Sequence, residues 1–347
     1  ANIKYYAGIV AEKATLRRLI RTNEEIANTC YSGKESLDTI LESTESKINE
    51  VVQKKNVKEF VPIRTVVMNA MDKIEKASKL HGTVTGIATG FIDLDYRTAG
   101  MQPSDLVLIA ARPSMGKTAF VLNIAQHVAF KQNLPVAIFS LEMSNVQLVN
   151  RMLSLESSVD ADKLRKGRLD SNDWGKLIEG ADGIAKSKLI IDDTPGITIS
   201  ELRSKCRKYK MENNLGLIII DYLQLMSGNG RTESRQQEIS DISRSLKALA
   251  RELDVPVVTL SQLSRAVEQR PDHRPMLSDL RESGAIEQDA DVFMFLYRDD
   301  YYNKDTELKG IAEIIIAKQR NGPIGTVKMA WIPEQTRFAD LAKNMGS

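Results

Sequence analysis

The fold is decided by the stretch Ala111-Arg112-Pro113-Ser114-Met115-Gly116-Lys117-Thr118. It follows the apolar run 106–110, which predicts a buried strand, and it opens onto 119–126, a run of helix formers with helical spacing. Strand, tight loop and helix in this order are typical of a phosphate-binding loop. The N–H groups at the start of the helix would face a phosphate, Lys117 would reach the β- and γ-phosphates, and the Thr118 hydroxyl would bind Mg²⁺.

The loop departs from the usual pattern at its first position, where Ala111 replaces glycine. The alternative to a phosphate site is a solvated lysine at a helix start. That alternative does not explain why Pro113 and Gly116 shape the same loop. The residues predicted to bind nucleotide here are Ser114, Met115, Gly116, Lys117 and Thr118.

The composition shows no strong charge bias. The 347 residues allow one large domain plus a smaller piece. The net charge of +2, from 48 basic and 46 acidic residues, means that any nucleic-acid surface must be local. Cys30 and Cys206 have no metal or redox spacing and fit a reduced, cytoplasmic protein. There is no signal peptide and no apolar run of the ~18 residues that a membrane span needs, so we expect no membrane contact.

A helical segment and a linker precede the main domain. Residues 1–54 are helical in pattern, and the turn around 31–34 divides two apolar stripes, which predicts a helical hairpin. The chain lacks an initial Met and begins inside this pattern, so we expect a fragment. Residues 55–85 read as a linker with an amphipathic helix at 63–79, which would dock onto its own domain or onto a neighbouring subunit. We assign 86–347 to the main domain.

The main domain alternates apolar strands and helices. Its early strand–helix–strand units predict an α/β fold with a largely parallel central sheet covered by helices on both faces. The later strands follow one another too closely for crossover helices, so we expect an antiparallel extension. The predicted strands are 106–110, 136–140, 189–191, 217–220, 257–260, 292–297, 311–317 and 327–331.

Four strand ends carry polar residues. Because ligands bind at the carboxyl ends of strands in such sheets, these residues are candidates for the site. One alone could be a solvated residue where a strand leaves the sheet, but four in a phosphate-loop domain are harder to dismiss. They are Glu142, Asp221, Gln262 and the run Lys318-Gln319-Arg320.

The chemistry of phosphoryl transfer suggests roles for the first three. The metal must be held, and the charge on the transferred group must be stabilised. Asp221 would hold Mg²⁺ beside Thr118. Glu142 would polarise the attacking water as a general base. Gln262 would hydrogen-bond the γ-phosphate and report its loss.

The remaining cations have two interpretations. Lys318 and Arg320 stand two residues apart at the end of a strand and would lie on one side of it. This suits an arginine finger, a cation that one subunit places in trans against the nucleotide of its neighbour. Arg151 is a candidate for contact near the nucleotide, with a surface salt bridge as the alternative.

Five motifs together resemble those of the bacterial DnaB-type replicative helicases. The likeness is dense from residue 86 to the C-terminus and looser over the segment before it. Ala111 at the first loop position is usual in this family. The motifs are 111–118 quoted above, Phe139-Ser140-Leu141-Glu142-Met143, Ile220-Asp221-Tyr222-Leu223-Gln224-Leu225, Asp279-Leu280-Arg281-Glu282-Ser283-Gly284 and Lys318-Gln319-Arg320-Asn321-Gly322-Pro323.

The resemblance implies a RecA-like ATPase fold and a ring of six subunits. Such a ring uses ATP and Mg²⁺ to move 5′→3′ on single-stranded DNA and to unwind forked DNA. The resemblance also implies that helix 63–79 packs on the adjacent subunit and that most of the N-terminal domain is absent. It implies a primase and a helicase loader as partners, and it puts Gln319, with Lys318 and Arg320, at the nucleotide.

Two polar segments are candidates for contact with DNA. Residues 263–289 form a long connection with four arginines, and 229–235 is a second loop. Neither contains Phe, Tyr or Trp, so neither can stack on the bases of DNA. We therefore expect arginine side chains and main-chain N–H groups to contact the sugar-phosphate backbone. By resemblance, Arg281, Glu282 and Gly284 belong to the family's DNA-contacting loop.

Three classes of function remain open at this point. The first is a ring motor that couples hydrolysis to strand separation. The second is a RecA-like recombinase or clock-type ATPase, which assembles but does not unwind, and the third is a scaffold that binds nucleotide only to assemble. Glu142 and Asp221 argue against the scaffold. The motif at 281–284 and the linker helix argue against the second class.

Overall fold

The computed structural model describes residues 3–34, 36–37, 39–41, 43–44, 47–48, 51, 61–79, 84–227, 234–280 and 284–341. They belong to two compact units, Ala1–Lys79 and Leu80–Ser347.

The first unit is helical. α1 spans Ile3–Ser32. α3 spans Ile63–Lys79, and these are the bounds that the sequence predicted for the linker helix. The described residues of 37–51 are also helical, and Glu25 of α1 forms an ion pair with Lys47 at 3.7 Å. The apolar stripe of α3 is exposed. The surface on which it docks stays a prediction, as does the hairpin.

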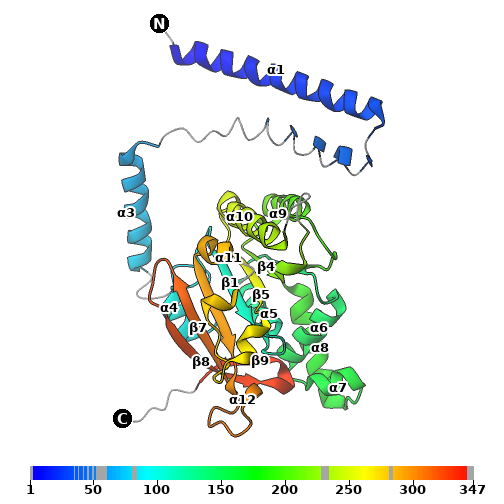
Figure 1. Ribbon diagram of the computed structural model, residues 1–347, viewed down its shortest axis with the longest axis vertical. Coiled ribbons are helices and arrows are strands. Elements are labelled where there is room, and N and C mark those ends of the chain that lie inside the picture. The colour runs from blue at the N-terminus through cyan, green and yellow to red at the C-terminus, as the bar shows by residue number, and fades with distance from the viewer. Residues whose placement is uncertain are drawn as a thin grey trace. The chain divides into compact units, whose positions relative to one another are not determined.

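The second unit is built on a nine-stranded sheet in the order β3-β2-β4-β5-β1-β6-β7-β8-β9 (Figure 1). The first six strands in this order are parallel, and the last three continue the sheet in antiparallel pairs. The strands are β1 (Leu106–Ala111), β2 (Val136–Ser140), β3 (Leu189–Asp192), β4 (Leu217–Asp221), β5 (Val257–Gln262), β6 (Val292–Tyr297), β7 (Ile311–Gln319), β8 (Gly325–Ile332) and β9 (Arg337–Asp340).

Helices connect these strands. The α-helices are α4 (Ile92–Thr98), α5 (Lys117–Gln126), α6 (Asn145–Ser157), α7 (Ala161–Lys166), α8 (Ser171–Lys186), α9 (Ile199–Asn213), α10 (Arg235–Leu253), α11 (Gly284–Asp289) and α12 (Asp299–Tyr302). A π turn, η1 (His127–Lys131), extends α5. The 3₁₀ turns are η2 (Leu223–Leu225), η3 (Arg265–Gln269), η4 (Leu277–Leu280) and η5 (Pro333–Gln335).

The sheet separates two apolar layers. Successive side chains of β1 point to opposite faces, so Val107 and Ile109 join the layer under α5 and α6, whereas Leu106 and Leu108 join the layer under α9 and α10. Because helices cover both faces (Figure 1), every residue of β1 is buried and apolar. This central position makes the end of β1 a rigid base for the loop that follows.

Two features of the sheet differ from the sequence prediction. β6 pairs in parallel with β1, because the connection 263–291 is long enough to cross over. The antiparallel extension therefore begins at β7. β9 is not predicted from the sequence, since its four residues carry no clear apolar alternation. It forms by folding back on β8 through η5.

Among the helices of the described residues, none combines the length and the apolar character that crossing a membrane requires.

Candidate active site

The phosphate loop leaves the end of β1 and turns into α5. Gly116 occupies the helix N-cap with φ 98°, in the left-handed region that favours glycine. A Cβ at this position would lie 3.0 Å from Cζ of Phe338. The side chain of Met115 is 1% exposed and anchors the loop in the core. No side chain of the described residues caps the start of α5, which leaves its N–H groups for a phosphate.

A cleft of about 480 Å³ lies over this loop. It brings together the ends of β1, β2 and β5, as expected for the carboxyl edge of a parallel sheet. Seven of the predicted site residues line it, namely Ser114, Gly116, Lys117, Thr118, Glu142, Arg151 and Gln262, whereas the Met115 side chain lies in the core. The lining residues are Arg112, Pro113, Ser114, Gly116, Lys117, Thr118, Ala119, Glu142, Met143, Arg151, Gln262, Trp331 and Thr336.

Asp221 and Thr118 form the part of the site that fits Mg²⁺. The Thr118 hydroxyl donates to Oδ2 of Asp221 at 2.6 Å. The other carboxylate oxygen, Oδ1, is buried and accepts no hydrogen bond from the described residues. Burial raises the pKa of Asp221, while Lys117, the Thr118 hydrogen bond and Arg151 oppose this shift. A hydroxyl and a carboxylate with a free oxygen are ligands of the kind Mg²⁺ prefers, so the residues present fit the ion.

Two cations complete the phosphate side of the cleft. The Lys117 ammonium lies 4.6 Å from the centre of the Tyr222 ring. Burial lowers the pKa of Lys117 and of Arg151, and in both cases Asp221 and Glu142 oppose the shift. The structure thus places Arg151 in the cleft wall near both carboxylates. A bound phosphate would stabilise both cations further, because it adds negative charge beside them.

Glu142 is held at the cleft by the turn between β2 and α6. The Ser140 hydroxyl donates to the Met143 carbonyl at 2.7 Å, and Ser144 with Gln147 forms a capping box that starts α6. The Glu142 side chain stays exposed at this turn, where it lines the cleft and can reach water.

Gln262 ends β5 and is exposed at the boundary of the cleft and a second pocket of about 420 Å³. Oε1 of Gln224 accepts from the Gln262 N–H at 3.3 Å, and its Nε2 donates to the Ser261 hydroxyl at 2.8 Å. These bonds fix the backbone and leave the Gln262 side chain able to respond to a phosphate.

The phosphate loop is also tied to the segment after β5. The Arg112 guanidinium donates to the Leu263 carbonyl at 2.7 Å and forms an ion pair with Glu268 of η3 at 2.7 Å. In return, the Leu263 N–H donates to the carbonyl of Ala111. A change at the loop can therefore reach the connection that carries the predicted DNA motif.

Lys318 and Arg320 lie at the opposite edge of the sheet from the phosphate loop. β7 runs antiparallel to β6, and Gln319 pairs with Val292 at the beginning of β6. β1 has six residues, so roughly 17 Å of strand separates the two edges. This placement follows from the antiparallel direction of β7, and it is compatible with the prediction that Lys318 and Arg320 act in trans. The Arg320 side chain therefore cannot meet the nucleotide of its own subunit.

The run 318–320 also divides between two sides of its strand. Lys318 and Arg320 both donate to the carbonyl of Gln288, which confirms that they share one side. Gln319 instead donates to the Arg97 carbonyl of α4 at 3.2 Å. It is therefore separated from the two cations.

Sequence reasoning missed the residues that β8 and η5 bring to the cleft. Trp331 and Thr336 line it, and the Trp331 ring lies 4.5 Å from that of Phe338. Asn123 of α5 holds this part in place by donating to the Thr336 carbonyl at 3.1 Å and accepting from the Phe338 N–H at 3.0 Å. No local sequence pattern predicts these contacts, because they depend on how β9 folds back on β8.

Of the predicted DNA-contacting residues, Arg281 and Glu282 lie outside the described residues, as do 229–233 of the second candidate loop. Gly284 is the first residue of α11. Arg270, in the same long connection, is bound to Asp279 through two hydrogen bonds of 2.6 and 2.7 Å and so serves the fold.

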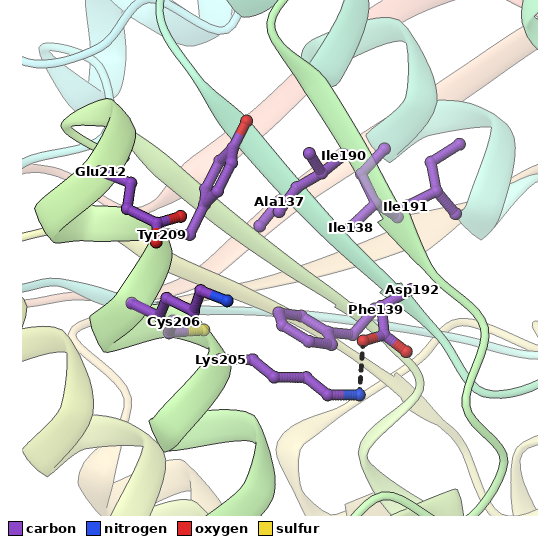
Figure 2. A pocket seen from close by; sticks show the side chains of 11 residues that line it. Ala137, Ile138, Phe139, Ile190, Ile191, Asp192, Lys205, Cys206, Tyr209 and Glu212 are labelled. Atoms are coloured by element: carbon purple, nitrogen blue, oxygen red, sulfur yellow. Dashed lines mark hydrogen bonds and ion pairs between the residues drawn. The ribbon is translucent and has the colours of Figure 1, made fainter.

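A separate pocket of about 310 Å³ lies between α9 and the edge formed by β2 and β3 (Figure 2). Figure 2 shows Lys205 reaching the carboxylate of Asp192, which it contacts at 2.7 Å. Burial raises the pKa of the Cys206 thiol to about 12, so this cysteine is unreactive near neutral pH. The pocket shares no lining residue with the nucleotide cleft.

Comparisons with known proteins agree with this geometry. The family model described as the DnaB-like helicase C-terminal domain matches residues 86–340. The chain is 57% identical over 344 residues to the replicative DNA helicase DnaB of Geobacillus stearothermophilus, which covers 99% of this chain and 76% of that protein. It is 56% identical to the replicative DNA helicase DnaC of Bacillus subtilis, with the same coverage.

A solved structure described as a DnaB-like replicative helicase and its interactions with primase superimposes with a TM-score of 0.84 at 40% identity. The match covers 98% of this chain and 80% of that one.

Proposed function

The chain belongs to the family of DnaB-like helicases, and from this premise we propose that it is an ATP-hydrolysing replicative DNA helicase. It moves 5′→3′ on single-stranded DNA as a ring of six subunits and hydrolyses ATP at the subunit interfaces. The observation that carries the proposal is the division of the catalytic residues between two edges of one sheet. Neither edge alone carries all the groups that hydrolysis needs. In a ring, the first edge of one subunit lies against the second edge of the next, and the two together form a complete site.

The first edge binds ATP and activates water. The N–H groups at the start of α5 and the Lys117 ammonium hold the phosphates, and Glu142 accepts a proton from the attacking water. Thr118 and Asp221 would hold Mg²⁺, which when bound neutralises charge on the β- and γ-phosphates. Gln262 contacts the γ-phosphate from the end of β5.

The second edge supplies the finger residues. Lys318 and Arg320 face a neighbour's nucleotide, because their own lies a full strand length away. There they stabilise the charge that develops on the transferred phosphoryl group. Gln319 supports this edge through its contact with α4.

The DNA grip consists of Arg281, the backbone N–H groups near Gly284, and Glu282, which orients the arginine. These groups hold the sugar-phosphate backbone, so binding does not depend on sequence. The substrates are single-stranded and forked DNA, and the work takes place in the cytoplasm. A primase and a helicase loader are the proposed partners. The solved relative described with primase supports the first of these.

The proposed division of the chain follows from the same family. Residues 1–54 are the helical remnant of the N-terminal domain, 55–85 are the linker, and 86–347 form the RecA-like ATPase domain. The exposed apolar stripe of α3 suits docking on the adjacent subunit.

A strand-displacement assay tests the proposal. With ATP and Mg²⁺, the chain should unwind a forked duplex that has a free 5′ tail and leave one with only a 3′ tail intact. A native mass measurement with an ATP analogue and single-stranded DNA should show six subunits. DNA-stimulated hydrolysis by a verified ring without any unwinding would favour a recombinase-like ATPase instead.

A further inference from the structure

Asp291 lies at the edge of the sheet that carries Lys318 and Arg320. It directly precedes β6, whose neighbours in the sheet are β1 on one side and β7 on the other. The residue is charged, yet it is only 6% exposed. A carboxylate is stable at such a depth only with charged or hydrogen-bonding partners, so its contacts indicate what it does.

Contacts with β1 and α10 fix this carboxylate in place. The Asp291 N–H donates to the Leu106 carbonyl at 2.9 Å, and Oδ2 of Asp291 accepts from the Leu106 N–H at 2.8 Å. Oδ2 also forms an ion pair with Lys247 of α10, and the same ammonium donates to the Ser104 carbonyl at 2.7 Å. Because β1 is fully buried and Lys247 is held by two acceptors, the carboxylate has little freedom to move.

The other carboxylate oxygen of Asp291 faces the proposed arginine finger. Oδ1 lies 3.3 Å from Nε of Arg320, and the Arg320 N–H donates to the Asp291 carbonyl at 3.0 Å. Asp291 therefore holds Arg320 both at its backbone and at the base of its guanidinium. The Gln288 carbonyl accepts from one terminal nitrogen, Nη2, at 3.1 Å.

These contacts leave the outer part of the guanidinium for a phosphate. A guanidinium carries five N–H donors on three nitrogens. Within the described part of the chain, the recorded contacts of the Arg320 side chain occupy Nε and Nη2, and the side chain remains 53% exposed. Because the guanidinium is planar and rigid, a fixed carboxylate at Nε gives the remaining donors a defined direction. A half-exposed ion pair adds little stability, so orientation is what this one supplies.

A second carboxylate on this edge provides a comparison. Asp105 directly precedes β1, and burial, with the nearby charge of Asp291, raises the pKa of Asp105 to about 6. Among the residues that the structure describes, the ion pair recorded for Arg320 is with Asp291 and not with Asp105. Asp105 therefore shares the surroundings of Asp291 but not its contact with the finger.

We propose that Asp291 is a positioning residue for the arginine finger. It holds Arg320 so that the outer N–H groups of the guanidinium face the nucleotide of the neighbouring subunit. The inference rests on the proposed function, in which Arg320 acts in trans. It has a directional consequence, because loss of Asp291 should damage the site to which its subunit gives the finger and spare the site that contains its own phosphate loop.

The variant Asp291→Asn in the full chain tests this inference. Asparagine keeps an oxygen that can accept from the Leu106 N–H, but it removes the charge that holds Arg320. We expect kcat for ATP hydrolysis, measured with single-stranded poly-dT, to fall about 10–100-fold, as for a misplaced catalytic group. KM for ATP should stay within about two-fold of the wild-type value. Asp105→Asn is the matched control, and it should keep the wild-type kcat.

Mixed rings separate a positioning role from a structural one. In an equal mixture with Glu142→Gln, about one quarter of the interfaces join a complete cleft from Asp291→Asn to an intact finger from Glu142→Gln, so hydrolysis should rise about three-fold or more above that of Asp291→Asn alone. Mixing with Arg320→Ala should give no rise, because neither subunit supplies an oriented finger. A general loss of structure would produce no such difference between the two mixtures. Native mass spectra show that the rings mix.

A kcat of Asp291→Asn near the wild-type value would overturn the inference, and so would equal behaviour in the two mixtures. Should Asp291→Asn fail to fold in a thermal melt, Asp291→Glu takes its place with the same expected results, because it keeps the charge but moves the carboxylate by one methylene. The mixture of Arg320→Ala with Glu142→Gln separates the two levels of the argument. No recovery there would contradict the finger in trans, and hence the proposed function, whereas recovery there without a rise for Asp291→Asn and Glu142→Gln contradicts only the role of Asp291.

Discussion

The action of Arg320 across a subunit interface can be tested with two inactive variants. Arg320→Ala removes the finger and keeps Glu142, whereas Glu142→Gln removes the general base and keeps the finger. Each alone should lose hydrolysis, and loss of a finger alone reduces kcat by about 10³–10⁵-fold. Nucleotide binding should survive in both, because it depends on Lys117 and the loop amides.

The fold should tolerate the loss of Arg320. Its ion pair with Asp291 at 3.3 Å is half exposed and contributes less than ~1 kcal/mol to stability. Asp291 keeps its bonds to Leu106 and Lys247 in the variant. A fall in hydrolysis can therefore be separated from unfolding by a thermal melt.

Mixing the two variants should restore activity. An interface works when an Arg320→Ala subunit supplies Glu142 and a Glu142→Gln subunit supplies Arg320. In a random equal mixture this occurs at about one quarter of the interfaces of a ring. Activity should therefore follow the product of the two fractions and peak at equal amounts. An arrangement in cis predicts no recovery, because no subunit carries both residues.

The assay measures hydrolysis over a series of mixing ratios at constant total protein, with native mass spectra to show that the rings mix. Lys328→Ala is a matched control, because Lys328 is an exposed cation of β8 in the same antiparallel part of the sheet. Its own activity should equal that of the wild type. Mixed rings with no activity at any ratio would refute the reasoning, since Arg320 would then have to cross roughly 17 Å to its own nucleotide.

Three further predictions concern the phosphate loop and the sheet. Lys117→Ala should abolish both ATP binding and hydrolysis, and wild-type affinity in a nucleotide titration would contradict its role at the phosphates. Gly116→Ala should lower the free energy of unfolding by about 1–2 kcal/mol, because alanine is strained at φ 98° and its Cβ would approach Phe338. The same change should weaken nucleotide binding. An unchanged melting temperature would contradict the predicted strain. Burial raises the pKa of Asp105 from 3.8 to about 6, so the stability it contributes is present below pH 3.8 and is lost as the pH rises through 6. Asp105→Asn should therefore flatten this decline and, after allowance for solvent screening of a half-buried group, gain ~1 kcal/mol over the wild type at pH 7–8, as measured by melting temperature against pH.

The parts of the site that depend on local pattern could be predicted from the sequence. The phosphate loop has a motif, and β1, β2, β4 and β5 are apolar runs with little ambiguity. The contact between Thr118 and Asp221 links residues far apart in the chain, yet their shared role at a metal predicted it, and their side chains are 2.6 Å apart. Here the chemistry supplied the distance information that local pattern lacks.

The parts that depend on long-range strand pairing could be predicted only in part. The sequence predicts an antiparallel extension, but it does not indicate that β6 still pairs in parallel with β1 and that the reversal comes at β7. Trp331 reaches the cleft only because β9 folds back on β8, a long-range pairing without a local signal. The sequence also does not indicate which residues form ion pairs over long distances in the chain. Arg112, for example, pairs with Glu268 of η3.

The DNA grip is the part of the proposal that depends most on the family, and its test is the salt dependence of binding. Arg281→Ala should weaken binding to single-stranded DNA about equally for all sequences, because the arginine binds the backbone. It should also reduce the slope of log K against log salt by roughly 0.7 for each phosphate that the arginine no longer neutralises. ATP hydrolysis without DNA should persist, since Arg281 takes no part in the nucleotide cleft, whereas DNA stimulation and unwinding should fall. Arg251→Ala, at an exposed cation near the end of α10, controls for the change in net charge. If Arg281→Ala matches this control in affinity and in slope, the grip lies in another segment, and 229–235 becomes the candidate to replace next.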